Sequence, residues 1–353
     1  MAPDVLAMIE ARRFHDTDAL RLATQSRQAI QDYLRFNPLD AHASRVLANQ
    51  VYHIAALLFR QGHASEALQN AHAATQVDGA SGHGVPVPAP RLWAEMADWE
   101  AQRGNRGAAD QALQEARHFI DANAIRKQVT EIAHEISVMR FDDAERRVRM
   151  AFGEDAAVYT RATNALPRLV QLRGSEHDPE VAALLLLWQQ QALDEAARAA
   201  LNLSRYTEAE AAAGALLSLP SQPGDVSERS YWDRPEDTDW GLVLLAEAVL
   251  KQGRRAEALK TLEPALAHYH DAQAKGAGFL AFRQHFARAL YVQALAEDSD
   301  GGGTARSREA LAQAVALLQG LTDEARQLHD SKELLSWIAA AQKKLNPATE
   351  EKK

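Results

Sequence analysis

A short motif that recurs along the chain constrains its fold more than any other feature of the sequence. In its clearest copies, Arg60–Ala74, Gln102–Ala116 and Lys251–Ala265, two polar residues precede a glycine, and an alanine follows after a short turn. Glycine readily adopts the left-handed backbone conformation that ends a helix. Alanine lets two helices joined by a tight turn approach each other closely. The motif therefore predicts a series of helical hairpins.

Three weaker copies extend the series. Met139–Ala151 and Leu203–Leu216 follow the same frame, and a sixth copy resumes at Glu309–Leu318 after an insertion. In the six copies the small residue expected in the second helix is Ala67, Ala109, Ala144, Ala209, Ala258 and Ala310. The matching position of the first helix holds Ala55, Ala97, Ile132, Ala197, Ala246 and Ala289. Small residues at both positions predict close packing of the two helices in most hairpins.

The rest of the sequence supports an all-α fold. Apolar residues recur at three- and four-residue spacing, and runs of alternating β-branched residues do not occur. Three segments rich in glycine, proline or charge are expected to be long loops: residues 78–90, 220–239 and 298–307.

The pattern resembles the tetratricopeptide repeat (TPR). In the second copy, the positions where that family places large, small and turn residues hold Trp93, Met96, Ala97, Gly104, Ala109, Leu113 and Ala116. The resemblance implies an α–α superhelix, or solenoid, of about six hairpins over residues 47–318. TPR units repeat every 34 residues, whereas successive second-helix alanines here lie 35 to 65 residues apart, so the superhelix is expected to be irregular.

The two ends of the chain are expected to cap this array. Residues 1–46 and 319–345 should form terminal capping helices with polar outer faces, with Asp330 or Ser331 as the N-cap of the last helix. The charged segment 346–353 is expected to be a disordered tail.

Composition and charge exclude several classes of protein. The chain has no cysteine, which excludes disulfides, thiolate metal sites and cysteine nucleophiles. Its net charge of −9 argues against non-specific nucleic-acid binding. The longest apolar run, Val181–Trp188, is too short to span a membrane, and the N-terminus lacks the pattern of a signal peptide. We therefore expect a cytoplasmic protein without membrane insertion, unless an anchor or upstream domain has been removed, and the composition suggests a bacterial source.

Motifs that would indicate catalysis are incomplete. His134 and Glu135 lack the second histidine of a zinc-protease helix, and Gly301–Thr304 lacks the lysine of a phosphate-binding loop. His268 and His270 would point to different sides of a helix. We expect no catalytic residue, no cofactor and no metal site.

Charged residues near Asp142 have a simpler interpretation. Asp142 and Asp143 fit the charged start of a helix, and Arg146, Arg147 and Arg149 fit a solvated, locally paired face. A basic docking patch is the alternative.

A superhelix of this kind would bind partners in a groove lined by the first helix of each hairpin. Helical period and the TPR resemblance place the following residues there: Tyr52, Arg91, Asp98, Asp194, Arg198, Trp240, Glu247, Arg283 and Phe286. The lysine, asparagine and arginine clamp of TPR proteins that hold chaperone C-termini is absent. The mixed aromatic and acidic character suits an amphipathic or mildly basic peptide. The alternative is structural, with Tyr52 and Phe286 in the core and Asp194 and Arg198 forming an i,i+4 pair.

The loop over residues 220–239 is a second candidate for partner binding. Tyr231 and Trp232 are costly to leave in water, so either the loop packs on the helices or a partner covers these rings.

The sequence favours a non-enzymatic scaffold or adaptor that binds a protein or peptide partner. A ligand- or peptide-sensing domain of a larger signalling protein is the alternative, and an all-α enzyme is a third. Self-association through an unpaired helix face is also open.

Overall fold

The computed structural model describes residues 16–80, 89–125, 131–220, 238–298 and 303–345, together with Ala7 and Glu10. These residues form 15 helices and no strand, which confirms the all-α prediction. They divide into two compact units, one ending at Phe152 and the other beginning at Gly153.

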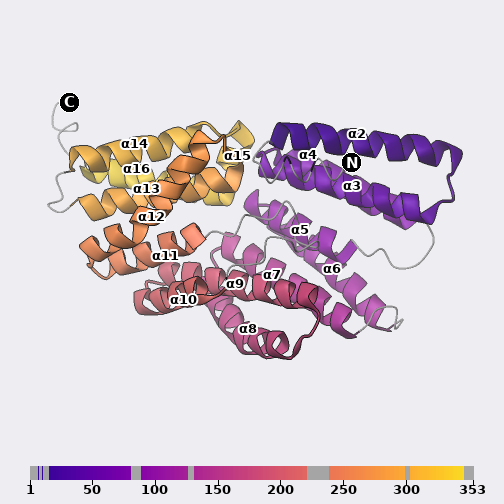
Figure 1. Ribbon diagram of the computed structural model, residues 1–353, viewed down its shortest axis with the longest axis horizontal. Coiled ribbons are helices and arrows are strands. Elements are labelled where there is room, and N and C mark those ends of the chain that lie inside the picture. The colour runs from indigo at the N-terminus through magenta and orange to yellow at the C-terminus, as the bar shows by residue number, and fades with distance from the viewer. Residues whose placement is uncertain are drawn as a thin grey trace. The chain divides into compact units, whose positions relative to one another are not determined.

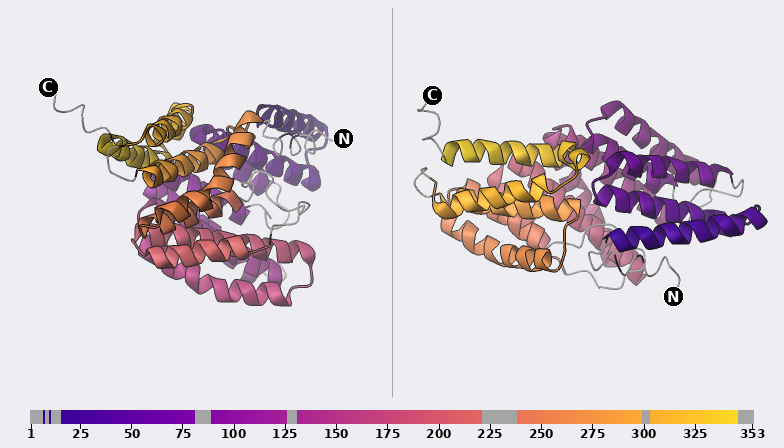
Figure 2. Two further views of the ribbon diagram at one scale, coloured as in Figure 1. Left: turned by 60° about the vertical axis from the view of Figure 1, so that its left-hand side comes forward. Right: turned by 90° about the horizontal axis from the view of Figure 1, so that it is seen from above.

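Each unit is built from helices that pack against their neighbours in the chain (Figures 1 and 2). Unit 1 contains α2 (Asp16–Phe36), α3 (Ala41–Arg60), α4 (Ala64–Ala80), α5 (Ala89–Gln102), α6 (Arg106–Ile125) and α7 (Glu131–Ala151). Unit 2 contains α8 (Asp155–Ser175), α9 (Pro179–Asn202), α10 (Tyr206–Ser218), α11 (Thr238–Lys251), α12 (Arg255–Ala274), α13 (Leu280–Glu297), α14 (Ala305–Gln319), α15 (Asp323–Gln327) and α16 (His329–Leu345).

A single turn geometry joins the helices of four hairpins. At the α3–α4 turn, the N–H of Gly62 donates to the Phe59 carbonyl and the N–H of His63 to the Leu58 carbonyl, both at 2.8 Å. This pair of bonds satisfies carbonyls that the end of a helix leaves without partners. The same pair recurs around Gly104, Ser204 and Gly253, and all four turn residues have a positive φ, between 59° and 86°.

The turn places a small residue at the same position of each second helix. The alanine five residues after the left-handed residue is Ala67, Ala109, Ala209 and Ala258, and each of the four is fully buried. Their partners in the first helices, Ala55, Ala97, Ala197 and Ala246, are fully buried as well. The predicted small residues are thus buried in α3–α4, α5–α6, α9–α10 and α11–α12, and the two helices of each pair pack against each other.

The last hairpin, α13–α14, also buries an alanine in each helix, but its second helix begins in a different way. Its second helix begins with its own N-cap, in which the Thr304 side chain accepts a hydrogen bond from the Ser307 N–H at 3.0 Å. Ala289 and Ala310 are buried in this pair. The segment predicted as a loop over residues 298–307 is therefore shorter, because α14 begins at Ala305.

The prediction for the third hairpin is wrong. No turn occurs near Met139, because α7 continues from Glu131 to Ala151. The left-handed residue is Gly153, with φ of 72°, and the buried residue five positions later is Val158. Because a valine stands where the other copies have alanine, the motif pointed to Ala144 instead.

Three predicted boundaries also differ. The proposed start of the array at residue 47 falls inside α3, which begins at Ala41. The segment predicted as a loop over residues 78–90 is helical to Ala80 and again from Ala89. The last helix begins at His329, so Asp330 and Ser331 lie within its first turn and are not its N-cap. Most of the 220–239 segment and the tail 346–353 lie outside the described residues.

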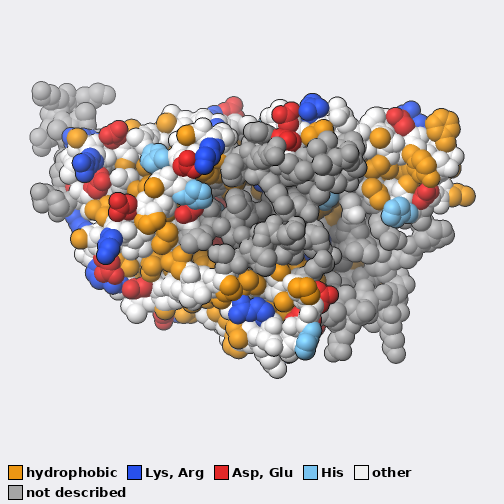
Figure 3. Space-filling view, in the orientation of Figure 1, with side chains coloured by type: hydrophobic (Ala, Val, Ile, Leu, Met, Phe, Trp, Pro, Cys, Tyr) orange, Lys and Arg blue, Asp and Glu red, His pale blue; other side chains and the backbone are white. Residues whose placement is uncertain are grey.

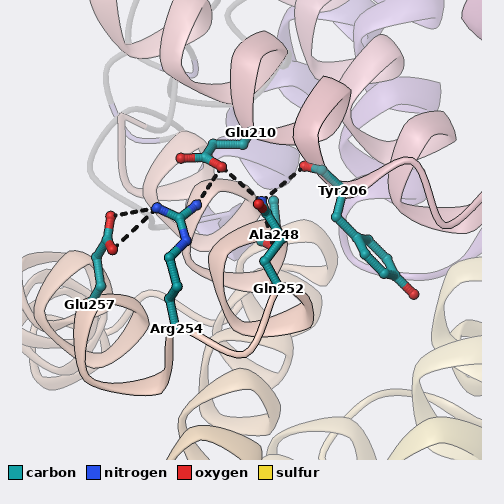
Figure 4. Close-up of polar contacts among 6 residues, drawn as sticks. All are labelled: Tyr206, Glu210, Ala248, Gln252, Arg254 and Glu257. Carbon is teal, nitrogen blue, oxygen red and sulfur yellow. Dashed lines mark hydrogen bonds and ion pairs between the residues drawn. The ribbon is translucent and has the colours of Figure 1, made fainter.

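Polar side chains connect successive hairpins at their turns. In Figure 4, Gln252 and Arg254 at the α11–α12 turn both donate to the Glu210 carboxylate of α10, Gln252 at 2.7 Å. These hydrogen bonds lower the pKa of Glu210, the one from Arg254 most. Asn202 at the α9–α10 turn likewise reaches Asp155 of α8 at 3.0 Å. In unit 1, Arg103 at the α5–α6 turn reaches Ser65 of α4 at 3.3 Å.

Large exposed hydrophobic side chains gather at the connection between α2 and α3. Tyr33, Phe36 and Leu39 are 49%, 84% and 92% exposed, and Figure 3 shows hydrophobic side chains at this end of the helix pair. They contribute little to the core of unit 1, which is built instead around contacts such as the stacked rings of Phe59 and Trp99, 5.0 Å apart.

We expect Ala258→Leu to lower the free energy of unfolding of unit 2 by about 1–3 kcal/mol, because the added carbons would push α11 and α12 apart. Ala256→Leu is the matched control, since Ala256 lies on the same helix and is exposed. Urea unfolding followed by tryptophan fluorescence measures the difference. Equal effects of the two substitutions would show that close approach at Ala258 is unimportant.

Candidate functional site

The middle of α13 is enclosed on every side. All eight residues from His285 to Val292 are buried, although two of them, His285 and Arg288, are polar. Buried polar groups are stable only when other groups hydrogen-bond or neutralise them. The partners of these two side chains therefore define a site within unit 2.

Arg288 is the centre of this site. Its Nε donates to the Glu247 carboxylate of α11 at 2.8 Å, and both side chains are less than one-tenth exposed. The guanidinium carbon lies 5.4 Å from the ring centre of Trp240 and 5.1 Å from that of Trp337 on α16. Both distances fit cation–π contacts. The buried Nη2 atom has no hydrogen-bond acceptor.

Trp240 connects α11 with α9 and α13. Its ring stacks on His285 with the centres 4.0 Å apart, and its Nε1–H donates to the Asp194 carboxylate at 2.6 Å. The indole is buried, and its one donor is satisfied.

The helix α16 adds charged residues to the site. Asp330 forms an ion pair with Arg198 of α9 at 3.4 Å, and Ser331 accepts a hydrogen bond from Gln284 of α13 at 3.1 Å. Although burial opposes the charged form of Arg198, surrounding carboxylates raise its pKa, Asp330 most strongly. Burial also raises the pKa of the half-buried Glu333 on α16.

We call this group the Arg288 cluster. It joins a buried centre to a half-buried rim and draws on four helices, α9, α11, α13 and α16. Its members are Asp194, Arg198, Trp240, Glu247, His285, Arg288, Asp330, Glu333 and Trp337.

Two other predicted groove residues of unit 2 lie in different surroundings. Phe286 is 1% exposed and stacks on Tyr269 of α12, so it belongs to the core between these helices. The guanidinium of Arg283 donates to the backbone carbonyls of Gly278 and Leu317, at 2.7 and 3.3 Å, and so ties the start of α13 to the end of α14.

In unit 1, the predicted groove residues pair along neighbouring helices. The guanidinium of Arg91 on α5 lies 5.0 Å from the ring centre of the buried Tyr52 on α3. Asp98 forms an ion pair with Arg147 of α7 at 3.3 Å. Next to Tyr52, burial and secondly the charge of Arg91 lower the pKa of His53 to about 4.

The interpretation of the charges near Asp142 is corrected. Asp142 and Asp143 lie in the second half of α7 and not at its start. Asp143 and Arg146 are buried and 3.5 Å apart, and Arg147 also contacts Asp143 at 3.2 Å. The predicted local pairing of these charges is confirmed, but Asp143 and Arg146 are buried and do not belong to a solvated face.

Sequence reasoning found four members of the Arg288 cluster and missed five. In the structural alternative Asp194 and Arg198 form an i,i+4 pair. The charge of Asp194 does act on Arg198, and in addition each side chain bonds to a different helix, α11 and α16. An available signal was the position of His285 and Arg288 within the apolar stretch of α13, where a polar residue requires a partner. Tyr231 and Trp232 lie outside the described residues.

Within the described part of the chain, every helix is too short or too polar to cross a lipid bilayer. The same residues contain no group of three or more histidine, aspartate or glutamate side chains arranged to hold a metal ion. No model of a known protein family matches the sequence. No curated protein matches it either.

Breaking the buried pair from one side should be strongly destabilising. We expect Glu247→Leu to lower the free energy of unfolding of unit 2 by about 3–5 kcal/mol, because it leaves the buried Arg288 charge without its hydrogen-bonded carboxylate. The double substitution Glu247→Leu with Arg288→Met removes both charges and should cost much less. Urea unfolding of the three proteins tests this, and a double variant as unstable as the single one would contradict it.

Acid should destabilise unit 1 through His53. The unfolded chain binds a proton at this side chain below about pH 6.5, whereas the folded chain does so only near pH 4. The free energy of unfolding should therefore fall with falling pH between these values, by at most about 1.4 kcal/mol per pH unit. His53→Gln should remove this part of the slope. Denaturant unfolding at several pH values, compared between variant and wild type, measures it.

Proposed function

We propose that the chain is a non-enzymatic interaction protein that binds a protein or peptide partner. In this proposal the hairpins stack as a TPR-like α–α superhelix, and the first helices of successive hairpins form the binding face. The Arg288 cluster is the part of that face in unit 2, since α9, α11 and α13 are first helices and α16 follows them.

The observation that carries the proposal is that the Arg288 cluster buries charged side chains, which is unfavourable for folding. Within unit 2 the two helices of each hairpin pack largely through alanine and leucine, which need no partners. Replacing a buried ion pair by apolar residues is often neutral or stabilising. A chain that places two arginines, four carboxylates, a histidine and two tryptophans together, on four helices, therefore gains something other than stability from them. Recognition of a partner is the function that such a multi-helix surface serves best.

The rim of the cluster can contact a partner without unfolding of the unit. Asp194, Arg198, Asp330, Glu333 and Trp337 are half-buried and come from both ends of unit 2 in sequence. Contacts to several helices at once favour an extended partner over a small molecule, which would need an enclosed pocket.

The test is capture of partners from a lysate of the source cells by the full chain. We expect a specific protein to be retained by wild type and lost with the rim variant Asp330→Asn plus Glu333→Gln. The control is Glu257→Gln plus Glu263→Gln, which changes two exposed carboxylates on the second helix α12. The captured protein is then produced on its own and its affinity for each variant measured.

Two outcomes would count against the proposal. Equal capture by the rim and control variants would remove the Arg288 cluster from the binding face. No capture, together with a higher melting temperature in the presence of a small molecule, would favour the ligand-sensing alternative.

A further inference from the structure

We infer that the segment bound at the Arg288 cluster is amphipathic and basic, with a lysine or arginine side chain directed at Asp194 and Glu333. This inference rests on the proposed function, because it names the chemistry of the partner at the same site. Its observations are the unequal charges of the cluster and one buried donor without an acceptor.

The carboxylates of the cluster outnumber its arginines. Arg288 neutralises Glu247 at 2.8 Å, and Arg198 neutralises Asp330 at 3.4 Å. Asp194 accepts its hydrogen bond from the neutral indole of Trp240. Burial raises the pKa of Glu333, and this effect exceeds the opposite effect of the positive charges of His329, Arg288 and Arg198. Arg198 is thus shared among Asp330, Asp194 and Glu333, and the four carboxylates of the cluster have two arginines to neutralise them.

A cation from a partner would correct this imbalance. Arg198 of α9 and Asp330 of α16 lie 3.4 Å apart. Asp194 is one helical turn from Arg198, and Glu333 is one turn from Asp330, so the two carboxylates border the same part of the rim. A lysine or arginine side chain placed there would meet two half-buried carboxylates, where charge pairs are stronger than at a fully exposed surface. An acidic segment would be repelled for the same reason.

The second observation is the Nη2 atom of Arg288. This atom is buried and has no hydrogen-bond acceptor, and the whole Arg288 residue is only 7% exposed. A buried donor without an acceptor has lost its hydrogen bond to water and gained none in return, which is unfavourable. Because the cluster already has an excess of carboxylates, the acceptor that suits this atom is a neutral carbonyl oxygen, such as a partner's backbone provides.

The tryptophans explain why the partner should also be apolar in part. Trp337 is half-buried, whereas Trp240 on the other side of Arg288 is buried. Trp337 is therefore the ring that can move to admit the carbonyl group, and its exposed portion offers an apolar contact. Basic and apolar groups side by side describe an amphipathic segment.

The experiment uses the full chain and two synthetic peptides. Both are short, capped and helix-forming, with leucine at helical spacing; one carries lysine and the other glutamate at every polar position. Tryptophan fluorescence, to which Trp240 and Trp337 contribute, follows the titration. We expect the lysine peptide to bind at least tenfold more tightly, with an affinity that falls as salt rises.

Variants then locate the binding. Asp194→Asn plus Glu333→Gln keeps the shape of both side chains and should weaken the lysine peptide roughly three- to tenfold. Glu257→Gln plus Glu263→Gln removes the same number of charges from α12 and should have no effect. Arg288→Lys keeps the charge beside Glu247 but removes the Nη2 donor, and it should weaken binding severalfold. Circular dichroism and melting temperatures confirm that the variants fold.

Three results would overturn the inference. They are equal binding of the two peptides, no binding of the lysine peptide, or equal weakening by Asp194→Asn plus Glu333→Gln and by the α12 control variant. These results are separate from the fate of the proposed function. If the lysine peptide fails but a captured partner still depends on the rim, the function stands and only the basic character is wrong.

Discussion

The close approach of two helices at a pair of alanines is the constraint on which the rest of the structure depends. In four hairpins the turn residue has a left-handed backbone, and the alanine five residues later is fully buried, as is the small residue of the first helix. Any larger pair at these positions would separate the helix axes. The rotation of each first helix follows from this contact, and with it the direction in which Asp194, Trp240 and Arg288 point.

Packing through small residues has a consequence for the polar side chains. On α9 and α13 polar residues lie on the same side of the helix as the alanines, since Asp194 is three residues from Ala197 and His285 is four residues from Ala289. In unit 2 these charges and aromatic rings bond to one another from helix to helix. Small apolar residues therefore set the backbone, and polar residues distinguish this face from any other face of the fold.

Local patterns in the sequence predicted the helices, four of the turns and the buried alanines, since each depends on residues a few positions apart. The third turn was missed because Val158 replaces the alanine of the motif. The Arg288 cluster could not be predicted from the sequence for a different reason. Its bonds join residues on different helices, such as Asp194 with Trp240 and Arg198 with Asp330, and local spacing instead suggested that Asp194 and Arg198 pair with each other. Asp143 and Arg146 were misjudged in the same way, because burial depends on the neighbouring helices.

The separate N-cap of α14 makes the last hairpin different from the others in one practical respect. Where a left-handed turn joins two helices, every residue of the connection is needed for register. Between α13 and α14, the side chain of Thr304 caps the start of the second helix, so this start is set by a residue of α14's own N-terminus. This is the place in unit 2 where evolution could add a segment, or an experimenter a fluorescent protein or a new pair of chain ends, while the helices on either side keep their alignment.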